Sequence, residues 1–200
     1  NQVGEHISIL KLHIELIEDF YVNFKDNCAI LKFLQIKFNF RIWEDRKLAD
    51  IGSVMIRQIE HFKNWADIVS VHAISGKKSL ESLESLENID IILIVEMSTE
   101  NNLMNEEYQK EAIKIAESNK KIIGVVSQHK ITHNKKIKHV VPGISLNKRN
   151  IDDQNYNTPD TKLFADVFVI GRSIYMSDDP KTEILKYKNL INNLTKYKRG

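Results

Sequence analysis

The chain has little of several features whose absence narrows the class of protein. It contains one cysteine, Cys28, so no disulfide can form within it, as is usual in a reducing compartment. Its 29 basic and 27 acidic residues leave a net charge of +2, which gives no electrostatic reason to expect a nucleic-acid partner. No apolar run approaches the roughly 18 residues of a membrane span, and no signal peptide opens the sequence. We therefore expect a soluble, cytoplasmic protein without a membrane partner.

Short apolar segments alternate with longer amphipathic ones along the whole chain. The short segments predict seven strands, at 7–11, 40–44, 68–72, 91–96, 122–127, 139–141 and 167–170. The longer ones predict helices at 18–38, 54–65, 80–86, 105–119 and 182–197. Most of the strands are apolar on both faces, as parallel strands between helices are. The sequence therefore predicts an α/β fold with parallel strands.

Seven strands are one fewer than a closed (β/α)₈ barrel of the TIM type requires. The chain opens like the tail of a helix that leads into the first predicted strand. We therefore expect residues 1–200 to form a single barrel domain that lacks strand 1 and most of helix 1. The polar segment 147–160 has no apolar periodicity, and we expect it to be a mobile loop rather than a domain linker.

The run from Glu44 to Gly52, EDRKLADIG, is the most informative stretch of the sequence. Asp45 and Lys47 are two residues apart, so their side chains point to the same side of an extended backbone. Asp50 lies beyond a turn whose Gly52 permits unusual backbone angles. A lysine flanked by two carboxylates stays protonated, because opposite charges favour its ammonium form. Such an array suits a reaction that makes a carbanion and then delivers a proton to it.

Polar residues also follow most of the other predicted strands. In a barrel of this type the chemistry lies at the carboxyl ends of the strands. A single lysine at such a place is usually solvated surface, and a single buried histidine is usually a hydrogen-bonded core residue. The placement of many polar residues at the same ends of the strands favours a functional site. The residues at these ends are Lys11, His13, Asp45, Lys47, His72, Glu96, Ser98, Gln128, Gly171 and Arg172.

The charged run resembles the Asp-x-Lys-x-x-Asp signature of the orotidine 5′-monophosphate decarboxylase family. Further segments are similar to that family over almost the whole chain. The segment 11–20 resembles a Lys-Thr-His-Val-Asp strand end, and 65–73 resembles the fourth strand. Glu96–Ser98 resembles the strand end that contacts the pyrimidine, Pro142–Ile144 a Pro-Gly-Val turn, and 169–174 the final Val-Gly-Arg turn.

The resemblance implies a reaction and a set of roles. Orotidine 5′-monophosphate would lose CO₂ to give uridine 5′-monophosphate, in the last step of de novo pyrimidine synthesis, without a cofactor or a metal. Lys47 would protonate C6 and Asp45 would lie beside the leaving carboxylate. Lys11 would organise the charges and contact the ribose, and Asp50 would reach the site of the partner in a homodimer. The implied substrate-binding residues are His13, Ser98, Gln154, Tyr156, Gly171 and Arg172.

Two positions depart from the family pattern, and two other readings stay open. Val54 stands where the family has a threonine that contacts the ribose, and no residue matches the aspartate that ends the family's first strand. A catalytically inactive scaffold or binding module within a larger assembly would keep the fold. Metal-dependent phosphosugar enzymes share the Asp-x-Lys-x-x-Asp run and would lose activity with a chelator. An upstream phosphoribosyltransferase domain is compatible with each reading.

Overall fold

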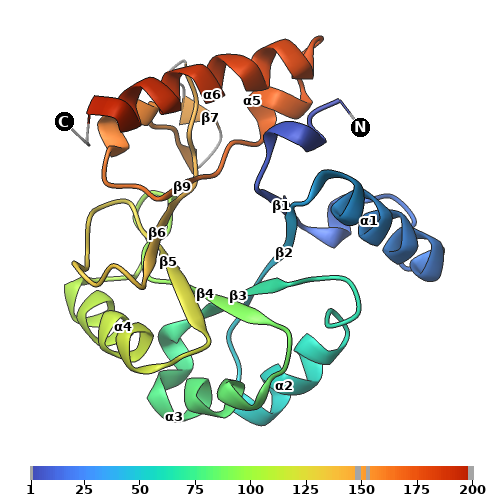
Figure 1. The fold of residues 1–200 in the computed structure, drawn as a ribbon. Helices are drawn as coiled ribbons and strands as arrows, with labels where there is room; N and C mark the ends of the chain where they lie inside the picture. The colour runs from blue at the N-terminus through green and yellow to red at the C-terminus, as the bar shows by residue number, and fades with distance from the viewer. Residues whose placement is uncertain (1, 147–149, 152–153, 198–200) are drawn as a thin grey trace.

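The computed structural model describes residues 2–146, 150–151 and 154–197, and Figure 1 shows their arrangement. Seven strands form one sheet: β1 (Ile9–Leu12), β2 (Arg41–Leu48), β3 (Ile68–His72), β4 (Asp90–Ile94), β5 (Ile122–Val126), β6 (Lys138–Val141) and β9 (Val167–Phe168). The α-helices are α1 (Phe24–Phe38), α2 (Gly52–Glu60), α3 (Gly76–Glu81), α4 (Glu106–Ser118), α5 (Arg172–Tyr175) and α6 (Pro180–Tyr197). Short 3₁₀ helices are η1 (Gly4–His6), η2 (Ile14–Leu16), η3 (Ala73–Ser75), η4 (Ser82–Ser85) and η5 (Pro159–Lys162).

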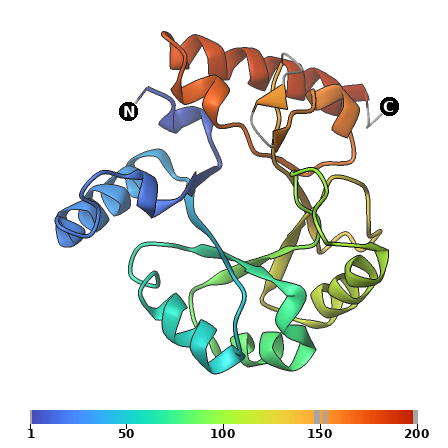
Figure 2. The same ribbon diagram turned by 180° about the vertical axis from the view of Figure 1, so that it is seen from behind.

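The sheet follows chain order, β1-β2-β3-β4-β5-β6-β9, and every neighbouring pair is parallel. It curls into an incomplete barrel with the helices on its outer side, as both views show (Figures 1 and 2). Within the described residues, no ladder joins β1 to β9, so each of these strands has one unpaired edge. The predicted α/β fold of the barrel type, with seven parallel strands, is confirmed.

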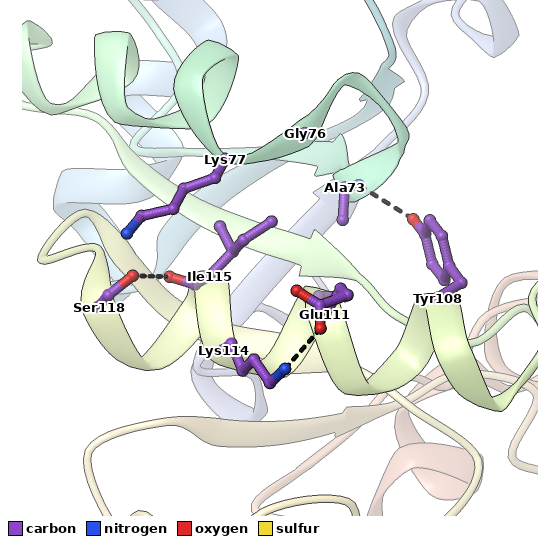
Figure 3. Close-up of a pocket in the computed structure, with 9 residues that line it drawn as sticks. Ala73, Gly76, Lys77, Tyr108, Glu111, Lys114, Ile115 and Ser118 are labelled. Carbon is purple, nitrogen blue, oxygen red and sulfur yellow. Dashed lines mark hydrogen bonds and ion pairs between the residues drawn. The ribbon is translucent and has the colours of Figure 1, made fainter.

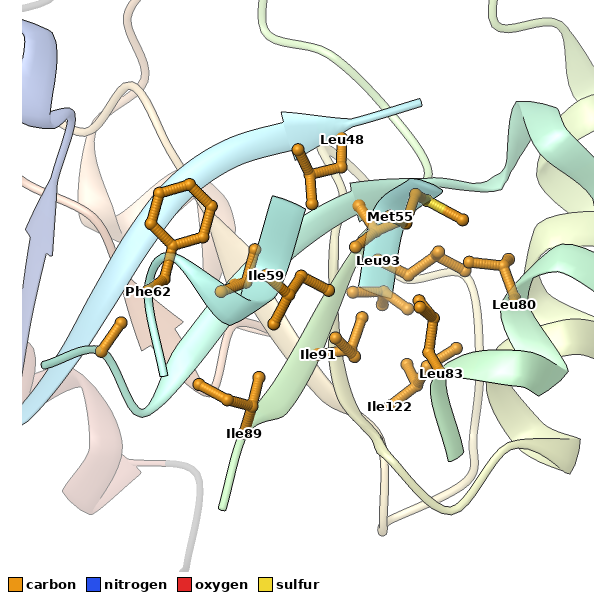
Figure 4. Packing of buried hydrophobic residues seen from close by; sticks show 14 of the residues in the cluster. Leu48, Met55, Ile59, Phe62, Leu80, Leu83, Ile89, Ile91, Leu93 and Ile122 are labelled. Carbon is orange, nitrogen blue, oxygen red and sulfur yellow. The ribbon is translucent and has the colours of Figure 1, made fainter. Parts of the chain in front are cut away.

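Two apolar layers hold the curled sheet together. The outer layer fills the space between the strands and the helices, and it includes Met55 and Ile59 of α2 and Leu80 of α3 (Figure 4). The inner layer lines the concave side with residues such as Trp43 and Ile94. Burial on both sides explains why these strands read as continuous apolar runs.

Gly52 has a packing role that differs from the predicted one. Its φ is not in the left-handed region, so unusual backbone angles are not the reason for this glycine. A Cβ at this position would lie 2.7 Å from the carbonyl oxygen of Ser79, closer than Cβ atoms approach other atoms. The glycine therefore allows the first turn of α2 to pack closely against α3.

Predicted and observed elements differ mainly at their ends. The predicted helix 18–38 begins only at Phe24, because turns occupy the residues that precede it. The predicted helix 80–86 is divided between α3 and η4. The segment 147–160 was expected to be a loop, yet it contains the antiparallel pair β7 (Asn150–Ile151) and β8 (Gln154–Asn155). None of the helices in the described part of the chain combines the length and the apolar character needed to cross a bilayer.

Candidate active site

The carboxylate of Asp45 is the centre of a charged cluster at the carboxyl ends of β1, β2 and β3. Its Oδ2 accepts hydrogen bonds from the ammonium groups of Lys11 and Lys47, each at 2.7 Å. Its Oδ1 accepts a hydrogen bond of 2.6 Å from the hydroxyl of Ser70. The Asp45 side chain is only 6% exposed. Three donors thus fix a buried negative charge at the mouth of the barrel.

Lys47 reaches this cluster from a distorted strand. Its φ is +52°, and the register between β2 and β3 shifts between Glu44 and Leu48. Its backbone N–H donates a 3.0 Å hydrogen bond to the Ser70 hydroxyl, which ties the distortion to β3. The predicted approach of Asp45 and Lys47 is confirmed, although a left-handed residue rather than a regular extended strand produces it.

The surroundings set the charges of the cluster. Burial alone would raise the pKa of Asp45, but Lys11 and Lys47 outweigh it and lower that pKa to about 2. Burial lowers the pKa of Lys11, and Asp45 opposes the change. Burial and the neighbouring Lys11 lower the pKa of His13 to about 4, so its ring is neutral at pH 7. His13 Nε2, 2.9 Å from Lys11 Nζ, therefore accepts a hydrogen bond from the ammonium.

Glu44 is a second buried carboxyl group in the charged run. It is 0% exposed, and neither side-chain oxygen has a hydrogen-bond partner of normal geometry among the described residues. Burial raises its pKa to about 7, although the backbone of Ile14 opposes the rise. Neighbouring residues of a strand point to opposite faces, and Ile42 and Trp43 of β2 belong to the outer and inner apolar layers respectively. Glu44 is thus placed on the helix side of the sheet and Asp45 on the barrel side.

The residues predicted to hold a phosphate meet after β6 and β9. Tyr156 is buried, and the guanidinium of Arg172 lies over its ring, with its carbon 5.4 Å from the ring centroid. Gly171 precedes Arg172, the first residue of α5. Gln154 lies in β8, but its side chain is outside the described part of the structure. The structure therefore brings Tyr156 and Arg172 together.

The remaining predicted residues lie near the same end of the barrel. Ser98 is half-buried in the bend that follows β4. Asp50 is exposed, and its Oδ1 accepts a 2.7 Å hydrogen bond from the amide of Ile51. Among the described residues, no hydrogen bond or ion pair joins Asp50 to Lys47 or Asp45 of its own chain, and its exposure leaves it accessible to a second molecule.

Ser70 is a member of the cluster that the sequence did not single out. It is fully buried, and it links the Asp45 carboxylate to the backbone of Lys47. The sequence did contain an indication of its role, because Ser70 is two residues before His72 on the same strand and so shares a face with that predicted strand-end residue. A serine within an apolar strand is otherwise unremarkable in sequence.

A pocket of about 490 Å³ lies elsewhere, on the outer side of the barrel (Figure 3). It is lined by residues of η3, α3 and α4, including Lys77, Glu111 and Tyr108. The Tyr108 hydroxyl accepts a hydrogen bond from the amide of Ala73 and donates one to the carbonyl of Ile94, each at 3.0 Å. Tyr108 therefore joins α4 to η3 and β4, and the pocket is separate from the charged cluster.

An α/β barrel with a lysine–aspartate–lysine cluster at its strand ends is the arrangement of an enzyme that stabilises a carbanion and returns a proton to it, and the comparison with known families specifies the class further. The model of the orotidine 5′-phosphate decarboxylase / HUMPS family matches residues 1–187. The chain belongs to this family.

Its relatives include orotidine 5′-phosphate decarboxylases and a longer protein, a uridine 5′-monophosphate synthase. The chain is 33% identical over 193 residues to the orotidine 5′-phosphate decarboxylase of Phycomyces blakesleeanus, covering 90% of this chain and 71% of the relative. It is 32% identical to the uridine 5′-monophosphate synthase of Bos taurus, covering 88% of this chain but only 38% of that protein. The orotidine 5′-phosphate decarboxylase structure from Pyrococcus horikoshii OT3 is 25% identical with a TM-score of 0.68, and the alignment covers 96% of this chain and 90% of that one.

The donor set at the site contains no clear metal centre. Within the described residues, no group of three or more His, Cys, Asp or Glu side chains is placed to hold a metal ion. Asp45, the carboxylate at the centre of the cluster, already accepts hydrogen bonds from two ammonium groups and a hydroxyl.

Proposed function

We propose that this chain decarboxylates orotidine 5′-monophosphate to uridine 5′-monophosphate and CO₂. The observation that carries the proposal is the Lys11–Asp45–Lys47 cluster, in which both lysines donate to one carboxylate oxygen at 2.7 Å. Family membership supports the same reaction. The fixed charges require little reorganisation when charge develops on the substrate, which is how preorganised sites lower a barrier.

In the proposed reaction the bond between C6 and the carboxylate breaks, and its electron pair stays on C6. Asp45 stays ionised because its pKa is about 2, and it lies beside the leaving carboxylate. The ammonium of Lys47 stabilises the negative charge and then donates its proton to C6. Lys11 and Ser70 keep Asp45 in place throughout.

The nucleotide's phosphate provides binding energy away from the reacting bond. We assign it to the guanidinium of Arg172 and the hydroxyl of Tyr156, with Gln154 from β8 and the Gly171 backbone as further contacts. A guanidinium matches the geometry of a phosphate with two parallel donors. Ser98 is proposed to contact the pyrimidine and His13 to adjoin the ribose. Energy from these remote contacts accelerates the reaction when it is expressed in the transition state.

We also propose that the active form is a homodimer in which Asp50 completes the partner's site. Asp50 is exposed in the single chain. Three large apolar side chains on the connections after β2, β3 and β4 are also exposed: Ile51 at 61%, Ile74 at 69% and Leu103 at 95%. A second molecule that covered these residues would bury apolar surface and bring its own Asp50 to the site.

The Lys47→Ala variant tests the reaction. We expect uridine 5′-monophosphate formation to fall by more than about 10⁴-fold, since general acid–base steps alone contribute about 10² to 10⁴. Lys63→Ala is the control, because Lys63 is exposed and its ion-pair partner, Glu60, lies on the surface outside the charged run. Activity of Lys47→Ala within tenfold of the wild type would contradict the assignment. Loss of wild-type activity on adding a chelator would favour a metal-dependent phosphosugar enzyme, and nucleotide binding without turnover would favour the inactive scaffold.

A further inference from the structure

The segment after β6 is held against the end of β5 by contacts that the proposed reaction does not use. Gln128, which follows β5, is the residue it contacts. The backbone carbonyl of Gln128 accepts a 2.8 Å hydrogen bond from the ammonium of Lys162. Its side-chain Oε1 lies 3.5 Å from Nδ2 of Asn157. Gln128, in the connection after β5, thus contacts both Asn157 and Lys162 of the segment that carries Tyr156.

Glu96 holds the backbone of Gln128 in place. Its carboxylate, 7% exposed, accepts hydrogen bonds from the backbone amides of Gln128 and His129, the latter at 2.9 Å. It also lies 3.1 Å from Nδ1 of His129. Glu96 is the second residue after β4, and β4 is paired on both sides, so the position of Gln128 depends on the end of a fully paired strand.

Asn157 anchors the other end of the same segment. Its amide donates to the carbonyl of Gly143 at 2.8 Å, and its carbonyl accepts from the amide of Ser145 at 2.9 Å. The next residue toward the N-terminus is Tyr156, whose ring lies under Arg172. The contacts to Asn157 and Lys162 therefore hold the segment that begins at Tyr156, one of the residues assigned to the phosphate.

We propose that Lys162 is a positioning residue for phosphate recognition, which it serves by holding the 156–162 segment against Gln128. The inference rests on the proposed function. Burial lowers the pKa of Lys162 and the nearby Glu96 carboxylate opposes the change. A segment held in place before the ligand arrives loses less conformational freedom on binding, so the ligand binds more tightly. The spacing of 34 residues between Lys162 and Gln128 explains why the sequence pattern did not reveal the contact.

The Lys162→Met variant tests this role, because it keeps the length of the side chain and removes its charge. We expect kcat/KM for orotidine 5′-monophosphate to fall about tenfold or more, the scale of a lost charged hydrogen bond. With orotidine, which has no phosphate, kcat/KM should change less than about twofold. The affinity for uridine 5′-monophosphate should fall by the same factor as kcat/KM for orotidine 5′-monophosphate, and the affinity for uridine should not fall. Gln128→Ala keeps the carbonyl and should cause a smaller loss.

Lys138→Met is the matched control. Lys138 also donates to a main-chain carbonyl, that of Lys135 at 3.4 Å, but it lies at the opposite end of the barrel strands. Equal losses with orotidine 5′-monophosphate and orotidine would show that Lys162 only stabilises the fold, and no loss with either would exclude any role. If the wild type bound the nucleotide but did not decarboxylate it, the proposed function would fail, while the binding measurements would still decide the role of Lys162.

Discussion

Asp45 and Glu44 are adjacent carboxyl groups with opposite surroundings. Asp45 has three hydrogen-bond donors and a pKa of about 2, whereas Glu44 accepts no hydrogen bond of normal geometry among the described residues and has a pKa of about 7. The strand places one on the barrel side and the other on the helix side. A two-residue stretch of sequence thus contributes one permanent charge and one group that titrates near neutrality.

Replacing Glu44 by Gln should flatten the dependence of stability on pH. The pKa of Glu44 is about 7 in the folded chain against an ordinary value of 4.5, so the folded state binds this proton more tightly. Its contribution to stability therefore decreases as pH rises from about 4.5 to about 7 and is constant above that range. At about 1.4 kcal/mol per pKa unit, the change in the free energy of unfolding amounts to at most about 3.5 kcal/mol. Urea unfolding at pH 5 and pH 8 measures it.

Glu60→Gln provides the control, because Glu60 is exposed on α2, where it pairs with the equally exposed Lys63. The wild type and this control should lose the same stability between pH 5 and pH 8, and Glu44→Gln should lose less. An identical loss in all three proteins would mean that Glu44 does not titrate in this window.

Local spacing made the Asp45–Lys47 pair predictable, because side chains two residues apart near one strand end lie close together. Ser70 is 25 residues from Asp45 in sequence, and Lys162 is 34 from Gln128. Such contacts depend on the relative placement of whole strands, which a residue pattern does not specify. The positive φ of Lys47 was also hidden, since lysine has no special preference for that conformation.

At the scale of elements, apolar runs predicted the strands well because the inner strands, such as β3 and β4, are buried on both faces. The predicted strand 68–72 has the bounds of β3, whose neighbours β2 and β4 pair with it on both sides. The strand predicted at 167–170 is shortened to β9, which pairs only with β6. The β7–β8 pair was missed, because two-residue strands in a polar segment leave no alternating apolar pattern.

The two unpaired strand edges predict the effect of supplying a further strand. We propose that a strand placed between β1 and β9 completes the barrel, because both edges otherwise carry unsatisfied backbone donors and acceptors. Fusing the strand–helix unit of a family relative, with an aspartate at the end of its strand, ahead of the chain should raise the urea midpoint, reduce light scattering and increase decarboxylation.

A proline in the middle of the added strand gives the matched control, because it removes a ladder hydrogen bond. The fused protein with proline should resemble the original chain. If the original chain already unfolds cooperatively, does not aggregate and reaches the activity of the fused protein, no additional strand is required.

For the whole molecule, the proposed sharing of Asp50 predicts complementation between two inactive proteins. Lys47→Ala and Asp50→Ala homodimers should each be nearly inactive. A heterodimer of the two has one site with both residues intact and one site with neither. Mixing equal amounts under conditions of random subunit exchange makes half of the dimers heterodimers, so activity should rise to about a quarter of that of the wild type.

Exchange itself must be measured, for example by mass spectrometry of differently labelled subunits. Restored activity together with exchange supports the shared site. Exchange without restored activity would place Asp50 in the site of its own chain, and a monomer at all concentrations with full activity would exclude the dimer.

The position of Lys11 on an edge strand affects how long the charge cluster stays complete. Lys47 and Asp45 belong to β2, which is paired on both sides, whereas Lys11 belongs to β1, which is paired only with β2. Edge strands open locally more often than central ones. Amide hydrogens of β1 should therefore exchange with solvent much faster than those of β3. Each opening of β1 withdraws one of the two cations from Asp45, so the lifetime of the complete charge cluster is set by the fraying of four residues at the rim of the sheet.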